Sequence, residues 1–387
     1  MDLMYLILAG GRGERLMPLT ENMPKPLVRF GSGGSIIDYT LYNCLESNGG
    51  NALVLTQYQA EMVERYLSVY WMHPFVSGGT KVEPLAGEDS EKGVFTGTAD
   101  AVYQALAGMS KLPETVVVLA ADHVYRMNYR YLVDFHHSHG KCATVGAVRF
   151  CPSQARRFGV MEVGEEGLVE SFFEKPATLE ETGIEEPLAS MGIYVFTTRK
   201  LMRYLERNQG EDSNDFGKDV LPRMIKDCEV YAFDYRDGKG QTPYWMDVGD
   251  LSSYWQAQMD LLDIKDNSLK FNALPGLGRL PFSKREVIAR LREGEKQITR
   301  SAVASSASIG KAVVEHSIIG PGTIVKDGAV IKNSVLLDGA FVHRGINIGG
   351  KVLPPMAEID SEAQDSIAGE GPACYPSFDK PLAMSSG

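Results

Sequence analysis

The chain has 387 residues, 44% of them hydrophobic, and 50 acidic against 39 basic side chains give a net charge of -11. The length predicts two to three domains, and the composition suffices for a buried core. The negative charge disfavours nucleic acid as a partner, because a polyanion would be repelled over most of the surface. No window approaches about 18 uninterrupted apolar residues, and the first segment resembles a strand, so we expect no membrane span, no signal peptide and a cytoplasmic protein.

The first predicted strand, Leu3–Ala9, runs directly into a glycine-rich stretch at residues 10–13. Without Cβ atoms, the backbone N–H groups of such a stretch can approach the phosphates of a nucleotide. Arg15 and Lys25 add positive charge where a triphosphate would lie. The spacing matches neither a dinucleotide fingerprint nor a P-loop. A tight turn with two surface cations is the alternative.

Up to about Leu262, short β-rich runs alternate with amphipathic helical stretches. The strands are expected at 53–56, 116–120 and 193–196, and helices at 60–69 and 99–106. This alternation predicts an α/β domain with a mostly parallel sheet covered on both faces. Ligands bind beyond the carboxyl ends of such strands, where residues 10–13 and 121–123 would lie.

The pattern changes after a linker and a charged helix between residues 271 and 297. Aliphatic residues then recur every six positions, at Val313, Ile319, Val325, Ile331 and Leu337 and again at Ile318, Ile324, Val330, Leu336 and Val342. A six-residue period predicts a parallel β-helix, here of one and a half to two coils. So short a stack should pack against the first domain or a partner chain. The predicted boundaries are 1–265 for the α/β domain, 266–300 for the linker, 301–357 for the β-helix and 358–387 for an irregular tail.

The five cysteines are scattered and odd in number, with no C-x-x-C pair, so we expect neither a disulfide framework nor a zinc site. Asp122 and Asp247 are better candidates for a metal site, since Mg²⁺ prefers hard oxygen ligands. Asp122 follows a predicted strand, and Asp247 lies in an aromatic-flanked turn. Either could instead serve only as a turn or cap residue.

Short motifs follow one another at residues 8–16, 23–28, 55–58, 97–101, 121–125, 158–161, 174–176, 190–196, 215–219 and 244–249. In these motifs the chain resembles the sugar-1-phosphate nucleotidyltransferases, and among them the bacterial ADP-glucose pyrophosphorylases. The resemblance implies a Rossmann-like nucleotide-diphospho-sugar transferase fold followed by a left-handed parallel β-helix, in a dimer or tetramer. It also implies Mg²⁺-dependent attack of a sugar 1-phosphate on the α-phosphorus of a nucleoside triphosphate, with release of pyrophosphate.

The resemblance assigns roles to individual residues. Arg15 would carry the charge of the pyrophosphate, Lys25 would bridge phosphates, and Lys175 would hold the sugar phosphate, while Asp122 and Asp247 would bind the metal. The nucleotide would meet Leu8, Ala9, Gly10, Gly11, Gly13, Gln57, Gly97 and Thr98. The sugar side would be formed by Gly159, Glu174, Lys175, Ser190 and Asp215.

The chain departs from the ADP-glucose enzymes at three places. Residues 30–35 lack the Lys and Arg linked to phosphorylated activators, so control by glycolytic intermediates is not expected. Residues 83–87 and 94–96 lack the usual groups near an adenine, and Glu83 resembles part of the GDP-mannose pyrophosphorylases, where its carboxylate could accept from guanine. Met246 replaces an Arg beside the sugar end.

Three functions therefore stay open. The first is transfer from ATP to glucose 1-phosphate or a similar sugar phosphate. The second is a specialised guanylyltransferase that uses GTP and a valienol-type cyclitol 1-phosphate in aminocyclitol antibiotic biosynthesis. The third is a non-catalytic regulatory subunit, against which the retained Arg15, Lys25, Asp122, Lys175 and Asp247 argue.

Overall fold

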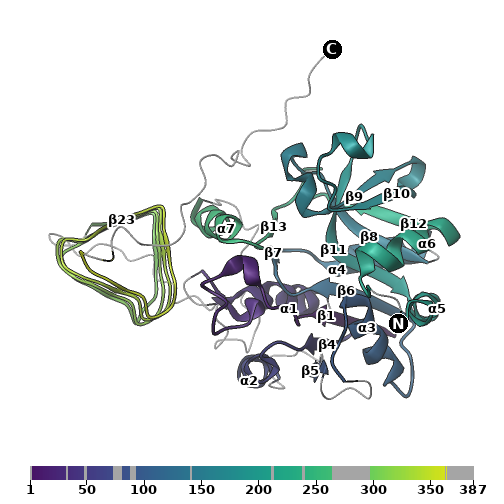
Figure 1. Ribbon diagram of the computed structural model, residues 1–387, viewed down its shortest axis with the longest axis horizontal. Coiled ribbons are helices and arrows are strands. Elements are labelled where there is room, and N and C mark those ends of the chain that lie inside the picture. Colours follow the sequence, from purple (N-terminus) through teal and green to yellow (C-terminus); the bar gives the residue numbers. More distant parts are fainter. Residues whose placement is uncertain are drawn as a thin grey trace, which may run out of the picture.

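A computed structural model describes residues 2–31, 34–47, 50–72, 81–87, 93–139, 142–210, 213–237, 240–263, 297–361 and 363. They form an α/β domain and, beside it, a prism of short strands that is triangular when viewed end-on (Figure 1). Within these residues no helix is both long and apolar enough to span a membrane.

The first domain alternates strands and helices. Its strands are β1 (Leu3–Leu8), β2 (Arg29–Phe30), β3 (Gly34–Ser35), β4 (Asn51–Thr56), β5 (Val82–Ala86), β6 (Thr115–Ala120), β7 (His123–Tyr125), β8 (Ala143–Val148), β9 (Gly159–Val163), β10 (Val169–Glu174), β11 (Leu188–Thr197), β12 (Val230–Asp234) and β13 (Trp245–Asp247). Its α-helices are α1 (Ile36–Glu46), α2 (Ala60–Tyr70), α3 (Thr98–Ala107), α4 (Tyr129–His139), α5 (Thr198–Arg207), α6 (Leu221–Asp227) and α7 (Leu251–Asp263). Short 3₁₀-helices are η1 (Glu14–Leu16), η2 (Lys25–Leu27), η4 (Pro152–Arg157), η5 (Glu165–Gly167) and η6 (Glu180–Thr182), and η7 (Phe216–Val220) is a short π-helix.

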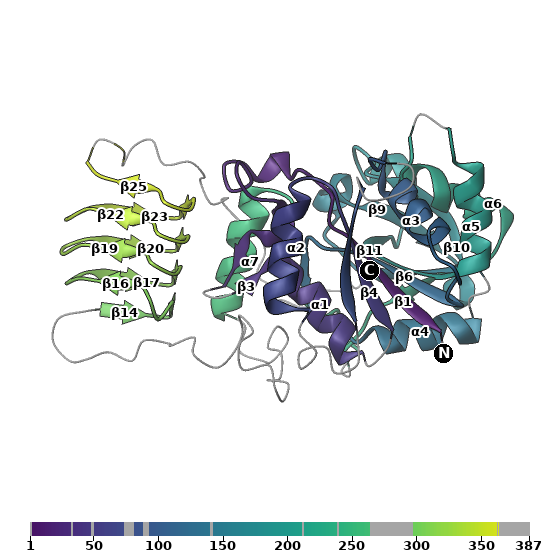
Figure 2. The ribbon, with the colours of Figure 1, turned by 90° about the horizontal axis from the view of Figure 1, so that it is seen from below.

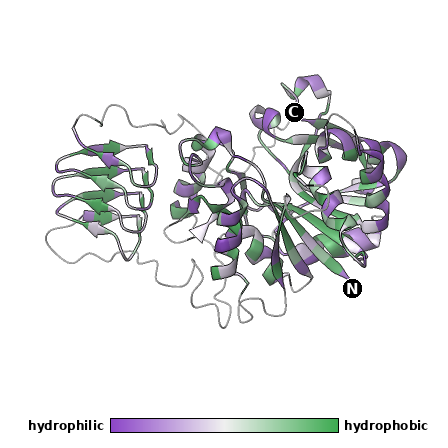
Figure 3. Ribbon diagram, turned by 60° about the horizontal axis from the view of Figure 1, so that its bottom comes forward, coloured by the Kyte–Doolittle hydropathy of each residue, from purple (hydrophilic) through white to green (hydrophobic). Residues whose placement is uncertain are grey.

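The main sheet has the strand order β10-β9-β11-β6-β1-β4-β5, and β8 joins β11 to β12. Strands β6, β1, β4 and β5 are parallel, whereas β11 runs antiparallel to β6, β8 and β9. The central strands consist largely of hydrophobic residues, green in Figure 3, as expected for strands that helices cover on both faces. In β6, Val117 and Leu119 face α1, α2 and α4, while Val116 and Val118 face α3, α5 and α6. The predicted α/β class is confirmed, with an antiparallel part added.

One cysteine pair contradicts the expectation of no disulfide. Cys142 and Cys228 are disulfide-bonded, with their Cα atoms 6.3 Å apart. They flank β8 and β12, which pair in register with Val230 opposite Ala143. The two cysteines are 86 residues apart in the sequence, so their spacing does not indicate a disulfide. The pairing of β8 with β12 brings them together.

The second domain is a parallel β-helix of three four-stranded sheets, whose strands stack beside α7 in Figure 2. Its strands are β14 (Gln297–Thr299), β15 (Ala302–Val303), β16 (Ser308–Ile309), β17 (Val313–Glu315), β18 (Ile318–Ile319), β19 (Ile324–Val325), β20 (Val330–Lys332), β21 (Val335–Leu336), β22 (Phe341–Val342), β23 (Asn347–Gly349), β24 (Val352–Leu353) and β25 (Glu358–Ile359). The arrangement is consistent with the predicted left-handed β-helix.

The β-helix is taller than predicted, since each of its sheets has four strands rather than two. Val313 lies above Gln297 and below Val330, so each coil is shorter than three full hexads. Consecutive interior residues are therefore sometimes five residues apart rather than six. For this reason the six-residue spacing does not extend over the whole of the first and last coils. Strand β14 begins at Gln297. Residues 264–296 and 364–387, which include most of the predicted linker and tail, lie outside the described residues.

The β-helix packs against the α/β domain, as expected for a stack of coils too short to be stable alone. Ile318, Val335 and Val352 on one face lie in a cluster with Val28 and Tyr254. The Arg29 guanidinium donates to both carboxylate oxygens of Asp338, at 3.0 and 2.6 Å. Trp255 Nε1 also donates to the carbonyl of Asn333 at 2.7 Å. These contacts connect the β-helix to α7 and to β2, which follows the segment carrying Lys25.

Candidate active site

A cavity of about 350 Å³ opens at the carboxyl ends of β1, β4 and β6 and at the first turn of α3. The predicted strand ends therefore lie at its wall, and the helix N-terminus adds N–H donors and a partial positive charge suited to phosphate. Several predicted nucleotide-binding residues line it together: Leu8, Ala9, Gly10, Gly11, Gln57, Gly97 and Thr98, with Lys25 and Asp122.

Gln57 contributes to the cavity mainly by fixing its wall. The side-chain amide accepts from the Phe95 backbone N–H at 2.7 Å and donates to the Phe95 carbonyl at 3.2 Å. Gly10 packs against it, since a Cβ at that position would lie 3.2 Å from Gln57 Cβ. Both polar ends of the amide are therefore engaged by one backbone residue.

Two residues predicted to bind the nucleotide, Gly13 and Glu83, do not line the cavity. Gly13 has a φ of 68°, and a Cβ there would come within 2.8 Å of Lys25 Cβ, so the glycine permits the close approach of Lys25. Glu83 lies on β5 opposite Leu53, away from the carboxyl end of that strand, and its side chain is 44% exposed and paired with Lys81 at 2.5 Å. The structure does not bring Glu83 to the cavity.

A charged cluster adjoins the cavity. Asp122 follows β6, and the antiparallel pairing of β7 with β13 places Asp247 opposite His123. The buried Lys25 ammonium donates to Asp122 Oδ2 at 2.7 Å and lies 3.8 Å from Asp247 Oδ1. Burial raises the pKa of Asp122, but the charges of Lys25 and His123 outweigh this effect and hold it well below its usual range.

Two arginines flank the same cluster. Arg157 donates to the Asp247 carbonyl at 2.9 Å and lies 3.6 Å from Asp250 Oδ2. Arg15 is exposed, and a Cβ at Gly249 would be 3.1 Å from its Nη2 and 3.0 Å from Asp247 Oδ1, so both side chains approach Gly249. Burial raises the pKa of Asp250, but Ser253 and these arginines lower it below its ordinary value. Sequence reasoning missed Arg157, which precedes the 158–161 motif without any distinguishing spacing.

The residues present fit a divalent cation. One ligand atom each from Asp122, His123 and Asp247 lies within 4.8 Å of the others. Two carboxylates from separate segments, leaving room for phosphate oxygens and water, are the kind of donor set that Mg²⁺ takes. The Lys25 ammonium on the same carboxylates shows that the electrostatics favour positive charge there.

The predicted sugar-side residues gather around the Glu174 carboxylate. Lys175, on the exposed side, donates to Glu174 Oε1 at 2.6 Å. A Cβ at Gly159 would overlap the Phe172 ring and lie 3.1 Å from Glu174 Oε2, whereas one at Gly217 would overlap that oxygen. Gly217 therefore leaves the space that the carboxylate occupies, and Gly159 leaves space chiefly for the Phe172 ring beside it.

Asp215 and Ser190 complete this side. Asp215 accepts from the Gly217 N–H at 2.8 Å and from the Thr98 hydroxyl at 3.2 Å, which joins the sugar side to the nucleotide cavity. Ser190 donates to the Tyr194 hydroxyl at 3.2 Å. Burial raises the pKa of Tyr194, and the nearby Glu174 and Asp215 carboxylates raise it further. Tyr194 is a second residue that sequence reasoning missed, although it lies within the 190–196 motif.

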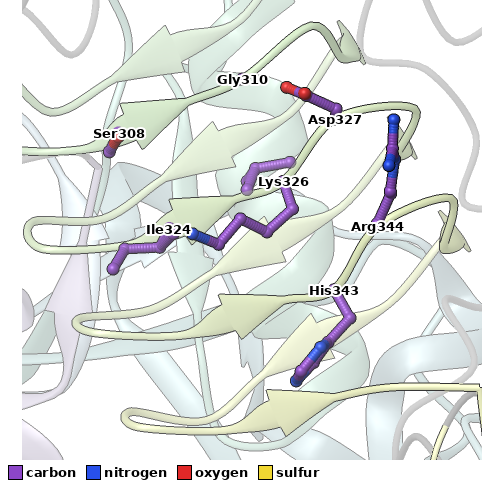
Figure 4. Close-up of a pocket in the computed structure, with 8 residues that line it drawn as sticks. Ser308, Gly310, Ile324, Lys326, Asp327, His343 and Arg344 are labelled. Carbon is purple, nitrogen blue, oxygen red and sulfur yellow. The ribbon is translucent and has the colours of Figure 1, made fainter.

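A second hollow, of about 410 Å³, lies on the outer face of the β-helix. Figure 4 shows Lys326 along this face, with Asp327 and Arg344 at the corner. None of the predicted site residues lines it. The smaller cavity, which gathers phosphate-binding and metal-binding groups, is therefore the candidate active site.

Comparisons with known proteins agree with this geometry over both domains. Residues 4–264 match the family described as nucleotidyl transferase, and residues 286–366 match one described as GlmU-like, C-terminal hexapeptide. A glucose-1-phosphate adenylyltransferase of Rhodopirellula baltica is 37% identical over 375 residues, covering 93% of this chain and 83% of that protein. Proteins of the same name from Hydrogenovibrio crunogenus (37% over 358 residues, 90% of this chain and 84% of that one) and Bacillus cereus (35% over 357 residues, 89% of each) are also similar.

Proposed function

This chain belongs to the nucleotidyl transferase family, and we propose that it joins glucose 1-phosphate to the α-phosphate of ATP, releasing pyrophosphate. It is a sugar-1-phosphate nucleotidyltransferase of the ADP-glucose pyrophosphorylase type. The names of its relatives support ATP and glucose as the substrates. The observation that carries the proposal is the continuity of the site, since Lys25 and Asp122 serve both the cavity and the charged cluster, and Thr98 connects the cavity to Asp215.

In the proposed reaction, an oxygen of the sugar phosphate forms a bond to the α-phosphorus. The bond between the α-phosphorus and the oxygen that bridges it to the β-phosphorus breaks, and its electron pair leaves with pyrophosphate. Both reactants are anions, so positioning and charge neutralisation supply most of the catalysis. The Lys25 ammonium would hold phosphate oxygens at the cavity, and the exposed Arg15 would bind the leaving pyrophosphate. On the sugar side, Lys175 would hold the sugar phosphate, and Glu174 would accept hydrogen bonds from sugar hydroxyls.

The proposed cofactor is Mg²⁺, held by Asp122 and Asp247. When bound, the ion would supply positive charge that stabilises the negative charge developing during transfer. Lys25, which pairs with Asp122 and lines the cavity, would bind phosphate oxygens beside this site. The convergence of the Asp122 and Asp247 oxygens supports this role, because carboxylates are the hard oxygen ligands that Mg²⁺ prefers.

The guanylyltransferase alternative has less support. Glu83, the residue expected to read guanine, is paired with Lys81 outside the cavity lining. Met246, which replaces an Arg of the family, points to the opposite side of β13 from Asp247 and is buried in an apolar cluster. The Met246 side chain therefore packs in the apolar cluster and not among the predicted sugar-side residues. The intact charged cluster likewise argues against a regulatory subunit without activity.

The testing experiment measures pyrophosphate release with Mg²⁺ from ATP, GTP, UTP, CTP and dTTP, each with glucose 1-phosphate and with a valienol-type phosphate. Release from ATP and glucose 1-phosphate is expected; release only from GTP, or only with the cyclitol, would replace the proposal by the specialised transferase. Asp122→Asn should abolish Mg²⁺-dependent turnover, whereas Asp134→Asn, an exposed control on α4, should not. Near-normal activity of Asp122→Asn would refute its role.

We further propose a homodimer or tetramer and a cytoplasmic location, as the resemblance implies. Sedimentation of the purified chain measures the first, and a single monomer mass at micromolar concentration would contradict it.

A further inference from the structure

His123 belongs geometrically to the charged cluster. Its Nε2 atom lies 3.5 Å from Asp122 Oδ1 and 3.8 Å from Asp247 Oδ1. Lys25 hydrogen-bonds the other Asp122 oxygen, Oδ2. The imidazole nitrogen and one oxygen of each carboxylate are therefore turned toward a common point, all within 4.8 Å of one another.

Packing, rather than hydrogen bonding, orients the His123 ring. Its side chain is 13% exposed, and the ring meets Trp245 edge to face at 5.2 Å between centroids. Gly192 lies behind it, because a Cβ there would be 3.2 Å from His123 Cε1. Among the described residues Nδ1 has no hydrogen-bond partner. The ring is thus held in place by apolar contacts that leave Nε2 facing the carboxylates.

The spacing of these atoms is informative. Good N–H···O hydrogen bonds are about 2.7–3.2 Å long, so the separations of 3.5 and 3.8 Å exceed those of a bonded pair. The Lys25 ammonium neutralises part of the carboxylate charge, at 2.7 Å from Asp122 Oδ2 and 3.8 Å from Asp247 Oδ1, but the three converging atoms are not bonded to one another, and a shared cation would connect them. An imidazole with carboxylates is a donor set that first-row transition cations take more readily than Mg²⁺, which prefers oxygen alone.

We propose that His123 Nε2 is a third protein ligand of the divalent cation, so that the site binds Mn²⁺ more tightly than Mg²⁺. The inference rests on the proposed function, which places a cation at Asp122 and Asp247. The nitrogen ligand would add affinity for Mn²⁺ and would anchor the cation to β7 as well as to β13. The ring needs no rearrangement for this, since its orientation is already set by Trp245 and Gly192.

The test measures Mn²⁺ binding to the full chain by electron paramagnetic resonance, with Mn²⁺ alone and with the uncleavable α,β-methylene ATP. Wild-type protein should bind Mn²⁺ at least tenfold more tightly than Mg²⁺ in competition, and the spin echo of the bound ion should show coupling to nitrogen. His123→Ala should weaken Mn²⁺ binding at least tenfold and remove that coupling. His123→Asn, which offers oxygen in place of nitrogen, should restore part of the affinity without the coupling.

His343→Ala, which changes a histidine on the outer face of the β-helix, is the matched control and should behave as wild type. Unchanged thermal unfolding of the His123 variants shows that they are folded. Tight Mn²⁺ binding without nitrogen coupling, or equal binding by His123→Ala, would overturn the role of His123 alone. No binding of either cation by wild type would overturn the proposed metal site as well.

Discussion

Replacing Gly217 by alanine should displace the Glu174 carboxylate and leave the fold intact. An alanine Cβ would overlap Glu174 Oε2 and lie 2.8 Å from Glu174 Cδ, whereas the nearest atom of Asp215 would be 3.4 Å away. The obstructing group is the end of a flexible side chain, so it can rotate away. Gly217 retains its N–H bond to Asp215, and no left-handed backbone conformation is required there.

The magnitude follows from the interactions that Glu174 would lose. A hydrogen bond to a charged group contributes about 1.5–3 kcal/mol, which corresponds to roughly a 10- to 150-fold change in binding. The KM for the sugar phosphate should therefore rise by about that factor, because Glu174 is expected to bind sugar hydroxyls and contacts Lys175. Alanine is favoured over glycine in helical backbone by up to about 1 kcal/mol, so the stability should change little.

Steady-state kinetics with varied sugar phosphate at saturating nucleotide provide the assay, paired with thermal unfolding. The KM for nucleotide should stay close to wild type. Combining Gly217→Ala with Glu174→Asp, which shortens the obstructed side chain, should recover part of the loss. Gly349→Ala is the control, since a Cβ there meets nothing within 4 Å. A folded Gly217→Ala with an unchanged KM for the sugar phosphate would refute this account of Glu174.

The other predictions concern stability and base choice. A double-mutant cycle of Arg29→Ala and Asp338→Ala should give a coupling of about 1 kcal/mol that falls at high salt, because the bidentate pair is partly exposed; zero coupling in unfolding experiments would contradict a role in holding the domains together. Burial, with smaller contributions from neighbouring charges, lowers the pKa of His136 from 6.5 to about 4, so its contribution to stability is full above pH 6.5 and is lost as the pH falls to 4. His136→Asn should flatten the pH dependence of unfolding over this range by up to ~3 kcal/mol, and an unchanged slope would count against it. Glu83→Gln should alter the use of ATP and GTP equally little, and a selective loss of GTP turnover would restore Glu83 as a base-reading residue.

Much of the α/β domain could be predicted because its signals are local. Continuous apolar runs such as β6 show buried parallel strands, and glycines or Asp122 directly after a strand lie at the ligand edge of the sheet. The six-residue aliphatic spacing similarly shows a β-helix. The sequence predicts too short a β-helix, because coils of unequal length shift Leu353 and Ile359 out of the strict period.

The sequence by itself determined the fold class, the order of the two domains and the edge of the sheet where the phosphate-binding groups gather. These follow from hydrophobic periodicity and from residues adjacent to their own strands. The tertiary structure decided which distant residues meet: His123 with Asp247 across β7 and β13, and Gly217 with Glu174. It also turned Met246 away from the sugar side. Strand pairing and side-chain direction depend on contacts between segments far apart in the chain, and no local pattern encodes them.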